Sequence, residues 1–158
     1  MEIEIGKLLI EKKYTIACAE SCTGGLLTDR LTNVSGSSAY VKGSIIAYSN
    51  EVKMNILHVK PETIQNFGAV SEQTSKEMAE NVRQVLKTDI GVSITGIAGP
   101  TGGTPEKPVG LVFIGISGPN GDKVEQFKFN GTRTDVKEKV VEAALVLIQV
   151  YLTIDKNL

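Results

Sequence analysis

The chain has 158 residues, of which 41% are hydrophobic and 22% are charged, so it has the length and composition of one ordinary globular domain. Its 17 basic and 18 acidic residues leave a formal net charge of −1, which argues against a nucleic-acid-binding module because such modules usually carry a basic excess. No apolar run approaches the roughly 20 residues of a membrane span. The opening residues place acids before lysines, the opposite of a secretory signal, so we expect neither membrane insertion nor export.

The thiol and imidazole content is low. Cys18 and Cys22 are the only cysteines and His58 is the only histidine, which gives too few ligands for a zinc site and leaves a Ser-His-Asp triad dependent on one residue. We interpret Cys18 as a core residue and Cys22 as a loop residue. Two thiols without an export signal indicate a reducing compartment, so we predict a cytoplasmic protein. Because metal ligands are few, we predict no metal, and we also expect no cofactor.

The first part of the chain predicts a helix, a buried strand and a second helix. Residues 2–13 carry apolar residues at helical spacing, and residues 14–19 are apolar without the polar alternation of a half-exposed strand. A turn over Glu20–Gly25 then leads into a helix at 26–31. The long apolar stretch over 39–48 predicts the second strand.

The middle of the chain predicts helices followed by a third strand. Ser49 to Glu51 is typical of a helix start, and Pro61 stands where a first helical turn would tolerate it. Ser71 opens a further helix that we extend to Lys87. Residues 90–94 are apolar and predict a strand, which runs into the Gly- and Pro-rich stretch 95–105.

The last part predicts a hairpin and a helix. Residues 109–117 predict a strand, Gly118–Gly121 a hairpin turn, and 124–129 an alternating edge strand. A final helix starts near 132–135. The resulting order, α-β-α-β-α-α-β-β-β-α, predicts an α/β fold: a single domain over 1–158, built as a three-layer α/β/α sandwich with a mixed, mostly parallel sheet.

Two loops leave the carboxyl ends of predicted parallel strands, which is where such sheets bind ligands. In the first loop, Ser21 lies between a buried strand and a helix, a place where backbone N–H groups could stabilise an oxyanion. Thr23, Gly24 and Gly25 would let the backbone approach a ligand closely. The alternative is that Ser21 or Thr23 simply caps the helix.

The second loop contains Thr95, Gly96, Gly99, Gly102 and Gly103, and successive N–H groups in such a loop can bind an anion. It lacks the spacing of a Walker P-loop or a Rossmann fingerprint, so a structural loop is an equal alternative.

Three other residues could belong to a functional site or have an ordinary structural or surface role. Arg133 lies beside the start of the last helix, a place suited to anions, although a surface role is its default. Tyr48 could plug the edge of the core, and Lys53 could be a solvated surface charge.

These motifs resemble those of the CinA C-terminal domain family, whose standalone members include nicotinamide mononucleotide deamidases. The resemblance covers roughly residues 3–150 and rests on several long motifs in the right order. They are AESCTGG (Ala19–Gly25), SGSSAYVKGSIIAYSNEVK (Ser35–Lys53), GAVSEQT (Gly68–Thr74), TGIAGPTGG with the following KPVG (Thr95–Gly110), and GTR (Gly131–Arg133).

The resemblance implies hydrolysis of the amide of nicotinamide mononucleotide to nicotinic acid mononucleotide and ammonia, within pyridine nucleotide recycling. It makes Ser21 the nucleophile, Lys53 its base and Tyr48 a support for the pair. It makes Thr95 and the glycines after it the lining of the substrate pocket. We add Glu20 to the expected substrate contacts, and we assign the phosphate to Arg133 and the second loop on electrostatic grounds.

The resemblance also implies a homo-oligomer, and a dimer is the simplest form. The chain departs from the family pattern at His58, where Leu-Gly-Val is usual, at Asn81, where glycine is common, and at Lys137, where arginine is often found. Lys lacks the bidentate fork of Arg, so the last change could weaken anion binding.

Two other functions stay open at this stage. The domain could be a non-catalytic nucleotide-binding module, although the intact set of Ser21, Tyr48 and Lys53 favours the enzyme. The family name also suggests a competence or DNA-repair protein. The net charge of −1 and the lack of a basic, aromatic-studded stripe argue against direct DNA binding.

Overall fold

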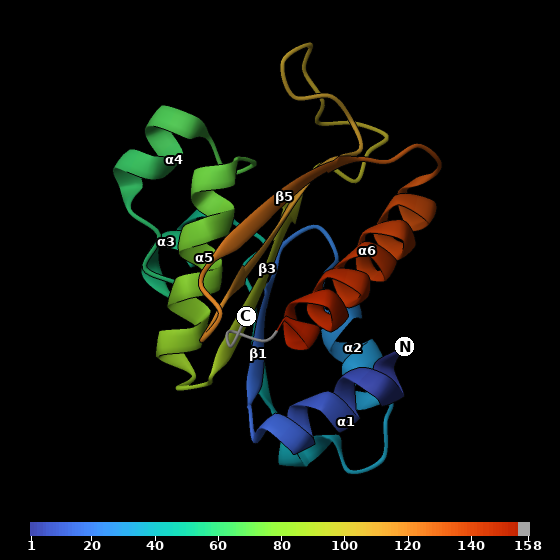
Figure 1. The fold of residues 1–158 in the computed structure, drawn as a ribbon. Helices are drawn as coiled ribbons and strands as arrows, with labels where there is room; N and C mark the ends of the chain where they lie inside the picture. Colours follow the sequence, from blue (N-terminus) through green and yellow to red (C-terminus); the bar gives the residue numbers. More distant parts are fainter. Residues whose placement is uncertain (155–158) are drawn as a thin grey trace.

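The computed structural model describes residues 1–154, and its centre is one five-stranded sheet with the order β2-β1-β3-β4-β5 (Figure 1). The strands β1, β2 and β3 are parallel, β4 runs antiparallel to β3, and β5 runs antiparallel to β4. The strand bounds are β1 Ile16–Glu20, β2 Val41–Ile46, β3 Ile90–Gly96, β4 Leu111–Ser117 and β5 Lys123–Lys128. The predicted mixed, mostly parallel sheet is therefore confirmed.

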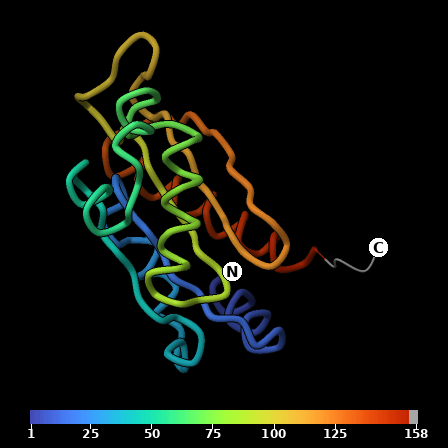
Figure 2. The backbone as a smooth tube through the Cα atoms, turned by 90° about the vertical axis from the view of Figure 1, so that its left-hand side faces the viewer, coloured from blue at the N-terminus to red at the C-terminus, as the bar shows by residue number. Residues whose placement is uncertain are grey.

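Helices cover both faces of the sheet, which confirms the α/β/α sandwich (Figures 1 and 2). One face carries α1 (Glu2–Lys12), α2 (Leu26–Thr32) and α6 (Arg133–Thr153); the other carries α3 (Asn50–Asn55), α4 (Pro61–Phe67) and α5 (Glu72–Val85). A short 3-10 turn, η1 (Ser37–Ala39), precedes β2. Among the described residues, no helix has both the length and the apolar character to cross a membrane.

The strand β1, which lies between β2 and β3, separates two apolar clusters. All five of its residues are buried, and alternate side chains point to opposite faces of the sheet. Ile16 and Cys18 join the larger apolar cluster with α1 and α6, whereas Ala17 and Ala19 join the smaller cluster under α5. Burial on both faces explains why this stretch of sequence shows no polar alternation.

Parallel pairing fixes where the loops emerge. Because β1, β2 and β3 are parallel, the residues that follow Glu20, Ile46 and Gly96 all leave the same end of the sheet. The predicted helix starts are found nearby: the hydroxyl of Ser49 accepts from the Val52 N–H, and Thr132 forms a capping box with Asp135.

Three details differ from the sequence-based expectation. The predicted order has two helices between the second and third strands, whereas the structure has three, because Pro61 opens its own short helix α4. The helix α5 ends at Val85 instead of Lys87. Tyr48 does not plug the core, since it is 63% exposed.

The backbone conformation at position 58 explains one departure from the family pattern. His58 is exposed, in the connection between α3 and α4, and has a φ of 56°, in the left-handed region. A side chain with a Cβ atom costs about 1–2 kcal/mol there, and glycine avoids that cost. The glycine usual at this position therefore has a local structural reason.

We predict that His58→Gly raises the free energy of unfolding by about 0.5–1 kcal/mol. Glycine removes the strain of a left-handed backbone in the folded chain, and this gain exceeds the cost of the greater conformational entropy that glycine gives the unfolded chain. Urea denaturation measures the change. The control is His58→Ala, which keeps the Cβ atom and should give no gain. A gain for alanine equal to that for glycine would show that the side chain of His58, and not its backbone, is unfavourable.

Candidate active site

Ser21 lies in the turn that follows β1 and is held there by backbone hydrogen bonds. Its N–H donates to the Ile94 carbonyl at 3.0 Å, and its own carbonyl accepts from the Gly24 N–H at 3.1 Å. The turn ends at Gly25, the N-cap of α2, whose φ of 106° suits glycine. The strand β1 and the helix α2 thus fix the position of the Ser21 hydroxyl.

The side chain of Lys53 reaches Ser21 from α3, the helix that follows β2. The Lys53 side chain is among the largest that are fully enclosed, with a residue exposure of 2%. Its Nζ atom lies 3.0 Å from Ser21 Oγ and donates to the Ala47 carbonyl at 2.8 Å. The lysine that composition alone would place at the surface is therefore buried against the predicted nucleophile.

Burial changes the protonation of this lysine. Loss of solvation lowers the pKa of Lys53 below its ordinary value, and the neighbouring Cys22 offsets part of that change. A lysine with a lowered pKa has a larger neutral fraction, and a neutral amine can accept the proton of a serine hydroxyl. Ser21 and Lys53 are therefore arranged as a nucleophile and its base.

A cavity of about 300 Å³ opens in front of Ser21, within the range of small-molecule sites. The two loops that the sequence placed at one edge of the sheet both contribute to it, and the loop after β2 joins them through Tyr48. Its lining consists of Ser21, Cys22, Tyr48, Gly96, Ile97, Ala98, Gly99, Thr101, Gly102 and Arg133.

Arg133 joins the two walls of this cavity. Its Nη1 donates to the Gly99 carbonyl at 2.7 Å, and its Nη2 donates to the Tyr48 hydroxyl at 3.1 Å. The Tyr48 hydroxyl accepts from Arg133, and within residues 1–154 no hydrogen bond joins it to Lys53. Arg133 therefore acts in this structure as a clamp between the loop after β2 and the loop after β3.

Three predicted substrate contacts have structural partners instead. The carboxylate of Glu20 is fully buried and accepts four hydrogen bonds, from Thr23 Oγ1, the Leu27 N–H, the Thr28 N–H and Thr28 Oγ1, at 2.6–3.0 Å. Thr23 is thereby committed to Glu20, and the hydroxyl of Thr95 is buried and donates to the Ala69 carbonyl. These side chains hold the loops together and do not face the cavity.

The other predicted glycines divide between the cavity and its surroundings. Gly96, Gly99 and Gly102 line the cavity, whereas Gly24, Gly25 and Gly103 are not part of its lining. Sequence reasoning missed Ile97, Ala98 and Thr101 as lining residues, although they stand within the second loop motif. Cys22 also lines it, and burial raises the pKa of its thiol to about 11, so it is not a reactive thiolate at neutral pH.

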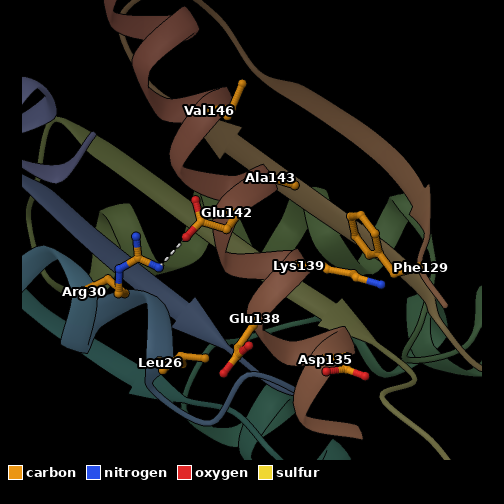
Figure 3. Close-up of a pocket in the computed structure, with 9 residues that line it drawn as sticks. All are labelled: Leu26, Arg30, Phe129, Asp135, Glu138, Lys139, Glu142, Ala143 and Val146. Carbon is orange, nitrogen blue, oxygen red and sulfur yellow. Dashed lines mark hydrogen bonds and ion pairs between the residues drawn. The ribbon is translucent and has the colours of Figure 1, made fainter. Parts of the chain in front are cut away.

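The larger cavity of about 710 Å³ lies elsewhere, between α2, α6 and Phe129 (Figure 3). Arg30 on its wall is paired with Glu142 of α6 and with Glu2 of α1, so its charge links three helices. None of the predicted catalytic residues lines this cavity. The smaller cavity at Ser21 is therefore the candidate active site.

Comparisons with known proteins agree with the motif resemblance. The sequence model of the CinA C-terminal domain matches residues 1–152. A CinA-like protein of Sulfurihydrogenibium sp. is 53% identical over 152 residues, which are 96% of this chain and 38% of that protein. The chain spans only 34–38% of the length of the curated relatives it matches.

Solved structures of similar length share the fold. A competence or damage-inducible protein from Enterobacter asburiae is 34% identical with a TM-score of 0.93, and the match covers 96% of both chains. The competence/damage inducible protein CihA from Agrobacterium tumefaciens is 36% identical with a TM-score of 0.88, again over 96% of both chains.

We predict that Glu20→Gln lowers the free energy of unfolding by at least about 1.5–3 kcal/mol, because an amide cannot replace the carboxylate as acceptor for all four donors. Chemical denaturation measures the loss. Thr23→Val removes only one of the four bonds and should cost less. A Glu20→Gln variant as stable as the parent would contradict the structural role of this carboxylate.

Proposed function

This chain belongs to the CinA C-terminal domain family, and from that premise and the site geometry we propose that it is an amidohydrolase acting on nicotinamide mononucleotide. The products are nicotinic acid mononucleotide and ammonia. The observation that carries the proposal is the 3.0 Å contact between Lys53 Nζ and Ser21 Oγ at the base of a cavity of small-molecule size.

The proposed reaction has two halves. Neutral Lys53 takes the proton of Ser21 as Oγ attacks the carboxamide carbon, and it then gives the proton to the leaving nitrogen, so that ammonia departs from an acyl-enzyme ester. In the second half Lys53 deprotonates water, which attacks the ester, and the proton returns to Ser21 Oγ. The balance is one amide and one water to one acid and one ammonia.

The turn after β1 offers donors for the oxyanion. The backbone N–H groups of Cys22 and Thr23 donate to no carbonyl oxygen among residues 1–154. They belong to the two residues after Ser21, and in the proposed mechanism they stabilise negative charge on the carbonyl oxygen.

The alternative, a non-catalytic nucleotide-binding module, needs a cavity but gives no reason for an enclosed lysine. Burial of an ammonium group costs stability, and a binding module gains nothing from holding Lys53 against a hydroxyl. Ammonia release from nicotinamide mononucleotide by the purified chain supports the enzyme, and binding without release supports the module.

We predict that Ser21→Ala lowers turnover of nicotinamide mononucleotide by roughly several thousandfold or more, as for other deleted nucleophiles. Substrate affinity should change little, because the lost hydroxyl forms a bond only during the reaction. Ammonia release and calorimetric binding measure the two quantities. Ser21→Thr is the matched variant that keeps a hydroxyl. A Ser21→Ala rate within about tenfold of the parent rate would show that Ser21 only positions the ligand.

We predict that Lys53→Met lowers turnover by orders of magnitude while the free energy of unfolding at pH 7 holds or rises. Because the pKa of Lys53 is lowered on folding, the unfolded chain binds this proton more tightly. The stability of the parent therefore falls as the pH drops from about 10 towards the folded-state pKa, and the methionine variant lacks this dependence.

The same ionisation should appear in the kinetics. Turnover by the parent should rise with pH through one ionisation below the ordinary lysine pKa of about 10.4, because the neutral amine is the base. Initial rates across the pH range, in buffers of constant ionic strength, measure it. If Lys53→Met keeps the rate and the pH profile of the parent, Lys53 has no part in the mechanism.

A further inference from the structure

We propose that Lys137 is the residue that binds the anionic group of the substrate, and that it makes this site selective for a phosphate monoester. The inference rests on the proposed function, since it names the residue that separates a nucleotide from the nucleoside. It differs from the sequence-based expectation, which gave the phosphate to Arg133 and the second loop.

The helix α6 directs Lys137 towards the turn that holds Ser21. Lys137 follows Arg133 by four residues, so the two side chains leave the same face of the first turns of α6. Its Nζ atom lies 3.9 Å from the point where a Cβ atom on Gly24 would be. Gly24 leaves this space open, and the ammonium group therefore rests beside the backbone of the Ser21–Gly25 turn.

The charge of Lys137 has no partner among the described residues. No hydrogen bond or ion pair joins its ammonium group to any residue from 1 to 154, although the side chain is half-buried. The acids along α6 have other places: Asp135 closes the cap with Thr132, Glu142 pairs with Arg30, and Glu138 lines the separate cavity between α2 and α6. Lys137 is not itself part of the cavity lining, but it lies one helical turn from Arg133, which is. A half-buried cation without a counter-charge at this position favours an anionic ligand.

The electrostatic effect of Lys137 reaches the cavity lining. Its positive charge, together with that of Lys53, opposes the rise that burial imposes on the pKa of the Cys22 thiol. Cys22 lines the cavity and neighbours Ser21. The ammonium group of Lys137 therefore lies close enough to Cys22, a lining residue, to interact with it electrostatically.

Arg133 has a different role from Lys137. Two of its nitrogen atoms are already bonded to the Gly99 carbonyl and the Tyr48 hydroxyl, so its removal would loosen both walls for any ligand. Lys137 contacts neither wall through a hydrogen bond. The two cations of α6 should therefore affect substrates differently: Arg133 affects all of them, and Lys137 affects only those with an anionic group.

The kinetic test compares nicotinamide mononucleotide with nicotinamide riboside, which lacks the phosphate. Lys137→Met should lower kcat/KM for the nucleotide by roughly 10- to 150-fold and leave the riboside within about twofold, because one charge-assisted contact is lost. Lys137→Arg should keep most of the discrimination. The control, Lys139→Met, removes a charge from the same helix, where Lys139 bonds to the Asn130 carbonyl. Arg133→Met should harm both substrates alike.

Equal losses on both substrates for Lys137→Met, or no loss on either, overturn the proposal. A binding measurement keeps this test separate from the proposed activity. Ribose 5-phosphate and ribose are titrated calorimetrically into the parent and into Lys137→Met. Preferential binding of the phosphate by the parent, lost in Lys137→Met, supports the anion site even if no amide is hydrolysed. Equal binding of ribose 5-phosphate by both proteins refutes it.

Discussion

The rest of the site depends on one contact, the buried amine of Lys53 against the hydroxyl of Ser21. The contact places an ionisable group in a position where its charged form is poorly solvated. A fold tolerates such a group only when the surrounding elements give it no other conformation. Here β2 and α3 bring the lysine to the end of β1, and the Ala47 carbonyl accepts from it.

Two further interactions keep that contact in place. The Glu20 carboxylate ties the turn after β1 to the first turn of α2, and the Arg133 guanidinium joins the loops after β2 and β3. Both use charged groups whose partners are backbone atoms and side-chain hydroxyls in equal number. Charge-assisted hydrogen bonds of this kind are strong and directional, so they fix loops that carry few apolar side chains.

The electrostatics of the site depend on how each of its charged groups is buried and hydrogen-bonded. The cations near the cavity have separate environments: Lys53 is enclosed, Arg133 is bonded to both walls, and Lys137 is free of partners within the described residues. With the roles proposed above, one fold holds a base, a clamp and an anion-binding group close together. The chemical difference between them comes from burial and hydrogen bonding, since two of the three are lysines.

The sequence by itself determined the layered fold, because apolar periodicity, the Ser49, Ser71 and Thr132 caps and the turn residues act locally. It also pointed to the two loops, since parallel strands share one ligand-binding edge. It did not separate Glu20 and Thr95, which hold loops, from the residues that line the cavity. Only the tertiary structure decided those roles, because burial and partners depend on elements distant in sequence. For the same reason the environments of Lys53 and Lys137, one enclosed and one half-buried, were decided only by the placement of α3 and α6.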